Sequence, residues 1–172
     1  ESATGTVTGV IVTAQVLPSL NMTISTGAID LGILVAWVES SNTLDIEVGT
    51  NAANGVYITA RSQSGGLTNT SNASLKIQDN QDVFDDLVDE SYMFASAINA
   101  ASDSTVAGFS QTAALNTEVN NATDEHTVYT SDKPQQALGV NDITFTVKAT
   151  TDAQTAAGNY QDMITFTIVG NF

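Results

Sequence analysis

Hydrophobic and polar residues alternate with a period of two along most of this chain. The alternating segments are rich in Val, Ile, Thr, Tyr and Phe, and clusters of Gly, Asn, Asp and Ser interrupt them. This pattern is typical of β-strands that bury one face. The expected strands cover residues 4–17, 21–25, 33–38, 44–48, 56–62, 74–78, 126–130, 143–149 and 163–169. The fold class predicted is all-β, an antiparallel two-sheet sandwich of immunoglobulin-like or jelly-roll type.

Turn residues suggest how some of these strands pair. Asn54-Gly55 has the composition of a type I′ turn, which would join residues 44–48 to residues 56–62 as a hairpin. Residues 143–149 and 163–169 both alternate with Thr, and we expect them to form a second hairpin. Residues 95–125 are rich in Ala, Ser, Thr and Asn with weak periodicity, which predicts loops and one or two poor strands.

The N-terminal segment, residues 4–17, is an unusually long apolar strand that Pro18 ends. Its apolar residues occupy both faces, with Val10, Val12, Ala14 and Val16 on one and Val7, Ile11 and Leu17 on the other. A free apolar strand in water invites aggregation, so we expect this strand to be covered. It either pairs within its own sandwich or completes the sheet of a neighbouring subunit, and strand periodicity leaves both open. The corresponding division is an arm, residues 1–17, and a β-domain, residues 18–172.

Charge excludes several classes of partner. The chain has 172 residues and a net charge of −15, with 19 acidic residues against four Lys and Arg. Nucleic acids and anionic membranes both require a cationic surface, so neither is an expected partner. No run of 18 apolar residues occurs, which argues against a membrane-spanning helix. The chain begins at Glu1, and we expect a secreted product whose leader has been removed.

Catalytic chemistry has little support in the residues. The chain has no Cys and one His, His126, which stands beside Asp124 and Glu125. No nucleophile elbow, zinc-protease motif or phosphate-binding loop occurs. A histidine at a strand edge explains His126 more simply, so no catalytic residue is assigned and no enzyme is predicted.

An acidic run covers residues 79–90 and contains six acids and no base. Its carboxylates are hard oxygen ligands suited to calcium, and the candidate ligands are Asp79, Asp82, Asp85 and Asp86. The EF-hand pattern is not met. We expect one short helix or helical turn in this run, as the single helix of the β-sandwich, because Val83, Phe84, Leu87 and Val88 recur at helical spacing. Most of the acids would then form a solvated face. No other cofactor is expected.

Four sequons and the aromatic residues are further candidates for surface chemistry. Asn69 and Asn72 lie in a predicted loop and are better candidates for glycosylation than Asn21 and Asn121. The aromatic side chains that could form a glycan-binding face are Trp37, Tyr57, Tyr92, Tyr129 and Tyr160. Ordinary core packing is the preferred explanation for them, since aromatics make up 6% of the chain.

Three stretches resemble exported fimbrial β-sandwich subunits: TVTGVIVTAQVLPSLNMTIS, TNAANGVYITA and AAGNYQDMITFTI. The last is similar to the final hairpin of archaic chaperone–usher pilins and spore-coat-protein-U-like domains. The overall plan also resembles TasA/camelysin matrix-fibre proteins and archaeal bundling pilins. In these groups an N-terminal strand inserts into the next subunit. The resemblance implies a self-associating extracellular polymer whose acceptor groove is bordered by Ile164, Phe166 and Ile168.

Two functions therefore follow from the sequence. The first is a structural filament subunit that donates residues from about Val7 to Ala14 to its neighbour. The second is a monomeric module at the cell surface that binds glycans or wall polymer through an aromatic face.

Overall fold

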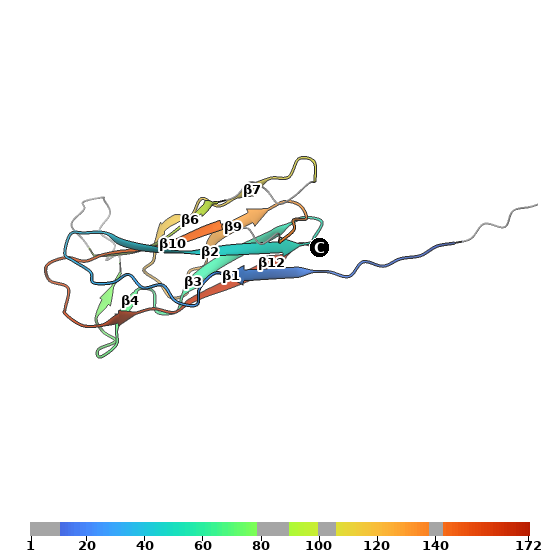
Figure 1. Ribbon diagram of the computed structural model, residues 1–172. Helices are drawn as coiled ribbons and strands as arrows, with labels where there is room; N and C mark the ends of the chain where they lie inside the picture. The colour runs from blue at the N-terminus through green and yellow to red at the C-terminus, as the bar shows by residue number, and fades with distance from the viewer. Residues whose placement is uncertain (1–10, 79–89, 100–105, 138–142) are drawn as a thin grey trace, which may run out of the picture.

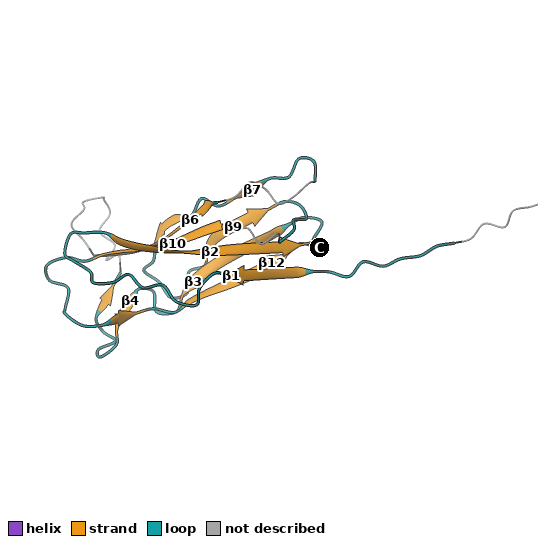
Figure 2. Ribbon diagram, in the orientation of Figure 1, coloured by secondary structure: helices purple, strands orange, loops and turns teal. Residues whose placement is uncertain are grey.

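The computed structural model describes residues 11–78, 90–99, 106–137 and 143–172. In these ranges the regular secondary structure consists of β-strands joined by loops (Figure 1). Two antiparallel sheets pack face to face, and a smaller third sheet lies at one end (Figures 1 and 2). This confirms an all-β architecture consistent with a sandwich. The described residues contain no helix. The helical turn expected in the acidic run falls on residues 79–89, outside the described ranges.

The larger sheet has five strands in the order β1-β2-β10-β6-β8. Their bounds are β1 Leu20–Ile24, β2 Ser40–Thr50, β6 Ser91–Ile98, β8 Asn116–Glu118 and β10 Ile143–Thr150. Burial alternates strictly along β10, because Ile143, Phe145, Val147 and Ala149 face the core and the Thr and Lys between them face outward.

The facing sheet has four strands in the order β12-β3-β9-β7. They are β3 Val56–Ser62, β7 Gln111–Thr112, β9 His126–Ser131 and β12 Ile164–Gly170. The third sheet has the order β11-β4-β5 and is formed by β4 Leu67–Asn69, β5 Lys76–Ile77 and β11 Tyr160–Gln161.

Aromatic rings join the two large sheets across the core. Phe145 on β10 meets Phe166 on β12 edge-to-face, with ring centroids 5.0 Å apart. Phe94 on β6 packs against both Phe145 and Tyr92. The inward residues of β2, β3, β9 and β10 complete a continuous apolar core.

Both predicted hairpins are wrong. Strand β10 pairs with β2 and β6, whereas β12 pairs with β3, so the two C-terminal strands belong to opposite sheets. Strands β2 and β3 are likewise divided between the sheets. The turn before β3 is closed by the Gly55 amide donating to Ala52 O, which makes Ala53 and Asn54 its central residues. A period of two identifies which face of a strand is buried. It does not identify the sheet to which the strand belongs, because strands of both sheets bury one face in the core.

Two other segments also differ from expectation. Residues 33–38 form no buried strand but an exposed loop between β1 and β2, which includes Ile33 at 92% exposure. Strand β6 was missed, because its alternation of Tyr92, Phe94 and Ser96 runs into the small-residue stretch that predicted loops.

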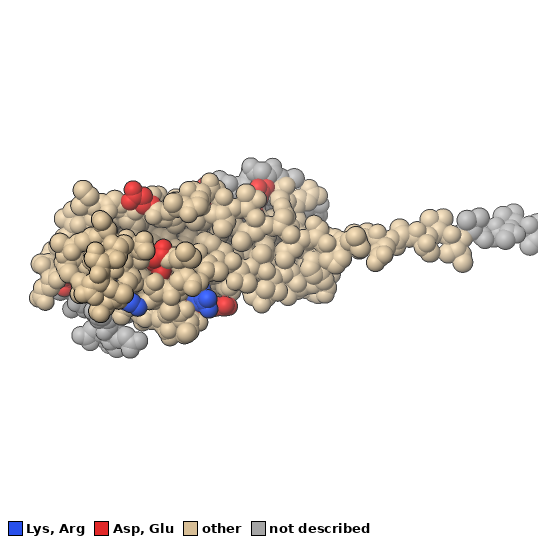
Figure 3. Space-filling view, turned by 90° about the horizontal axis from the view of Figure 1, so that it is seen from below, with Lys and Arg blue, Asp and Glu red and all other residues tan. Residues whose placement is uncertain are grey.

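The N-terminal arm, residues 11–19 of the described chain, extends away from the body (Figure 1). None of its residues belongs to a sheet of the described structure, and its apolar side chains are exposed, with Ile11 at 90% and Val12 at 88%. Figure 3 shows the arm projecting from a body whose visible face carries few charged side chains.

Candidate strand-acceptor groove

One side of the sandwich is open between β1 and β12, which are the edge strands of the two large sheets. The inward side chains of β1 are Leu20, Met22 and Ile24, and those of β12 are Ile164, Phe166 and Ile168. All six pack against the core yet stay partly exposed, in contrast to the fully buried inward residues of β2 and β10. This pattern marks a sandwich edge at which no strand of the described structure covers the apolar side chains.

The two edge strands run in opposite directions along this groove. The end of β12 lies beside the start of β1, since a Cβ on Gly170 would lie 3.5 Å from Leu20 Cδ1. The end of β1 and the start of β12 meet at the other end, where Ile24 and Ile164 line one cavity. The groove therefore widens away from the arm.

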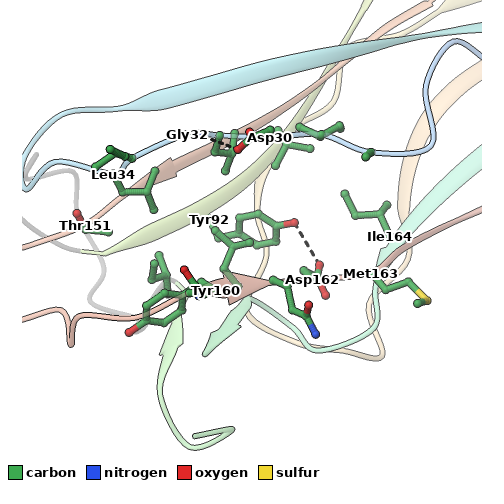
Figure 4. A pocket seen from close by; sticks show the side chains of 18 of the residues that line it. Asp30, Gly32, Leu34, Tyr92, Thr151, Tyr160, Asp162, Met163 and Ile164 are labelled. Atoms are coloured by element: carbon green, nitrogen blue, oxygen red, sulfur yellow. Dashed lines mark hydrogen bonds between the residues drawn. The ribbon is translucent and has the colours of Figure 1, made fainter. Parts of the chain in front are cut away.

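This cavity has a volume of about 1000 Å³. Figure 4 shows Asp30, Gly32 and Leu34 of the β1–β2 loop on one wall and Tyr160, Met163 and Ile164 on the other. Its apolar floor includes Leu44, Leu67, Ile77 and Val147. A cavity of this size and lining suits several aliphatic side chains.

A polar pair lies within the apolar walls. The Tyr92 hydroxyl donates a hydrogen bond of 3.2 Å to Asp162 Oδ2, and the Ser64 amide donates one of 3.2 Å to Asp162 Oδ1 (Figure 4). Burial, and then the charge and hydrogen bond of Asp162, raise the pKa of Tyr92 well above its ordinary value. The Tyr92 hydroxyl therefore stays protonated at neutral pH and can donate this hydrogen bond.

Asn51 holds the base of the arm. Its side chain donates to Leu17 O at 2.8 Å and accepts from the Ser19 amide at 2.7 Å, while its own amide donates to Ser19 O. These bonds fix the direction in which the chain leaves the body.

The other predicted site residues lie apart from the groove or outside the described ranges. His126 packs edge-on against Phe94 with centroids 6.0 Å apart, and its buried Nε2 lacks a hydrogen-bond partner in the described structure. Asp79, Asp82, Asp85 and Asp86 all lie outside the described residues. No group of three or more potential metal ligands occurs within the described ranges.

The sequons occupy different environments. Asn69 is 5% exposed, and its Oδ1 accepts hydrogen bonds from the Ser71 and Asn72 amides. Asn21, Asn72 and Asn121 are exposed. Among the aromatic candidates, Tyr92 and Tyr129 are core residues, whereas Trp37 is 49% exposed and Tyr57 is 38% exposed.

Sequence reasoning placed Ile164, Phe166 and Ile168 together, and the structure does bring them to one edge. Sequence reasoning did not identify the opposite wall, residues 26–34. It expected a buried strand over residues 33–38, whereas Ile29, Leu31 and Leu34 are half-buried residues of a loop. Comparison with family models, curated proteins and solved structures found no match to this chain. The described residues include no helix of the length and apolarity that crossing a bilayer requires.

Proposed function

We propose that this chain is a structural subunit of an extracellular filament, a pilus or matrix fibre, in which the arm of one subunit inserts into the groove of the next. One observation carries the proposal: within the described residues, one chain has both an exposed apolar arm outside any sheet and an apolar groove beside the edge strand β12. An arm inserted in the groove would gain backbone hydrogen-bond partners from the edge of β12, and its side chains would cover the apolar residues of the groove.

The placement of arm and cavity favours donation between subunits. The arm leaves the body beside the end of β12, and the cavity lies beside its start. A neighbour's arm that enters at the cavity runs antiparallel to β12. Such a head-to-tail contact is heterologous, and it generates an open filament when the rotation does not close a ring.

Insertion into the same chain is less compatible with this geometry. The arm directly precedes β1, so folding back would form a hairpin with β1 and leave the arm parallel to β12. The chain would have to reverse between Leu17 and Leu20, where Asn51 holds Leu17 O and the Ser19 amide.

The arm offers a suitable face for the groove. Val10, Val12, Ala14 and Val16 share one face, and the first three would pack on the row Ile164, Phe166 and Ile168, while Thr13 and Gln15 face solvent. Full burial of each valine contributes roughly 1.5–3 kcal/mol, and the backbone ladder fixes the register.

The alternative expected from sequence is a monomeric module that binds glycans or wall polymer. It would need an exposed aromatic face, and two of its five aromatic candidates, Tyr92 and Tyr129, lie in the core instead. The filament subunit is therefore the better supported function.

Electron microscopy of the full chain and of two double variants tests this function. Val10→Asp with Val12→Asp places carboxylates on the groove face and should leave soluble single particles. Thr13→Asp with Gln15→Asp adds the same charge to the opposite face and should still form fibres. Circular dichroism checks that both bodies stay folded. Normal fibres from the first variant, or only single particles from the natural chain at every concentration, contradict the proposal.

A further inference from the structure

An exposed apolar turn lies at the end of the molecule opposite the arm, in the loop between β1 and β2 (Figure 1). Its large side chains are Ile33, Val35, Trp37 and Val38, which are 92%, 57%, 49% and 54% exposed. Isolated apolar side chains on a surface are ordinary, but four within six residues form a patch of the kind that marks an interaction site.

Trp37 has a backbone conformation that its side chain does not favour. Its φ is 67°, and it is the only non-glycine residue with positive φ in the described structure. The Val38 amide donates to Val35 O at 3.1 Å, so Trp37 occupies the third position of a turn, where Gly or Asn is usual. The Trp37 amide donates to Thr151 O at 2.8 Å, which anchors the turn to the end of β10.

A strained, half-exposed tryptophan points to a function outside the subunit's own stability. Glycine would adopt the same backbone conformation without strain, so the turn itself does not explain a tryptophan at this position. Tryptophan is also the residue most enriched at energetic centres of protein interfaces.

The length of the groove indicates which segment reaches this turn. Strands β11 and β12 lie in succession, so their outer edges extend from Tyr160 to Gly170, eleven residues. The apolar arm from Val7 to Leu17 also has eleven residues. At about 3.3 Å per residue both extend about 36 Å. An antiparallel arm that pairs Val10, Val12 and Ala14 with Ile168, Phe166 and Ile164 places Val16 and Leu17 opposite Asp162 and Gln161, next to Tyr160.

Tyr160 lies at the same end as the turn. Tyr160, Ala36 and Thr151 all line the cavity, and Ala36 and Thr151 form a parallel β-bridge next to Trp37. The base of an inserted arm would leave the groove beside the turn. The residues at that base, Val16 and Leu17, are 83% and 70% exposed in the free chain.

We infer that the Trp37 turn is a subunit–subunit docking site that receives Val16 and Leu17 of a second copy of this chain. The inference rests on the proposed strand donation and adds a second contact to it. The groove would hold the arm, and the turn would cover the arm's base and the junction between the two bodies.

Trp37 is the chain's only tryptophan, so its fluorescence reports this contact directly. The acceptor is the full chain with Val10→Asp and Val12→Asp, which cannot donate its own arm. Two labelled peptides serve as donors, residues 4–18 and residues 4–14. Anisotropy measures their binding, and tryptophan emission measures cover of the turn. We expect both peptides to bind, and only the longer one to shift the emission to shorter wavelength.

A Trp37→Gly acceptor separates the contact from folding, because glycine accepts a φ of 67° without strain. We expect it to remain folded and to bind the longer peptide about 30-fold more weakly, the loss typical of a hot-spot side chain. Tyr57→Ala, at a half-exposed aromatic on β3, should have no effect. Equal binding of both peptides without an emission shift overturns the docking site and leaves strand donation intact. Binding of neither peptide overturns both.

Discussion

Tyr92 and Asp162 place a charge on a groove whose other walls are mostly apolar. Asp162 lies between β11 and β12, and a carboxylate on a free strand edge disfavours indiscriminate pairing with other strands. Tyr92 and the Ser64 amide hold that carboxylate in place. At the scale of single residues, the acceptor edge therefore combines apolar attraction with one fixed charge that a partner strand must accommodate.

Replacing Tyr92 with Phe tests the hydroxyl contact with Asp162. Loss of this hydrogen bond should lower the free energy of unfolding at pH 7 by about 1.5–3 kcal/mol, because the bond is to a charged group. The raised pKa of Tyr92 adds a pH dependence with a definite sign. Its contribution to stability is complete below the unfolded pKa near 10 and declines as the pH rises above it.

Urea unfolding at pH 7 and about pH 11 measures both effects. The natural chain should lose more stability between these pH values than Tyr92→Phe does. Tyr57→Phe, on the outer face of β3, serves as the control and should behave like the natural chain. An equal alkaline loss in the natural chain and in Tyr92→Phe would show that Tyr92 is not the responsible group.

At the scale of elements, the sequence predicted which segments are strands better than it predicted their partners. The alternation of β10 and β12 identified Ile143, Phe145, Ile164 and Phe166 as inward-facing, and they are. The same alternation fits a hairpin and a pair of facing strands, so both hairpins were wrong. The loop wall of the groove was not predicted, because Ile29, Leu31 and Leu34 lie in a loop and acquire their direction from tertiary packing rather than from a strand period.

In the proposed complex, residues of the arm that lie opposite the outward side chains of β12 must all be odd-numbered or all be even-numbered, and cysteine pairs can test which. Directly opposite residues on neighbouring strands point to the same side. If Val10, Val12 and Ala14 face the core with Phe166, the outward Thr165 lies opposite an odd-numbered arm residue. A Thr165→Cys chain mixed with arm variants carrying Cys at 11, 12, 13, 14 or 15 should crosslink only at odd positions. The natural chain has no cysteine, so each product on a non-reducing gel is unambiguous.

A second acceptor distinguishes the two edges of the groove. Thr23→Cys places a thiol on the outward face of β1, and it should crosslink less than Thr165→Cys if the arm adds to the sheet of β12. Crosslinking at even positions would mean that Ile11 and Thr13 face the core instead. Crosslinking to Thr23→Cys alone would assign the arm to the edge of β1.

At the scale of the whole molecule, the charge of −15 has to be reconciled with polymerisation. Few cations offset it, and the described structure records one ion pair, Lys148 with Glu39 at 3.4 Å. The proposed head-to-tail assembly would bring these net charges together at every junction. The binding of the arm in the groove would then have to overcome a repulsion that depends on ionic strength.

This repulsion predicts that salt accelerates assembly. The Debye length falls from about 30 Å in about 10 mM salt to about 8 Å in about 150 mM salt, so charges on neighbouring bodies are screened at the higher value. Light scattering should show a shorter lag and a higher yield of fibres in the higher salt. The Val10→Asp, Val12→Asp chain should give no signal in either, which ties the scattering to strand donation.

Calcium chloride at matched ionic strength separates screening from binding. An effect beyond that of sodium chloride would assign a cation-binding role to the acidic run at residues 79–90, while equal effects would leave screening as the whole explanation. A rate that is unchanged or lower in salt would mean that the net charges do not meet at the junction, and a head-to-tail arrangement of closely packed bodies would then be wrong.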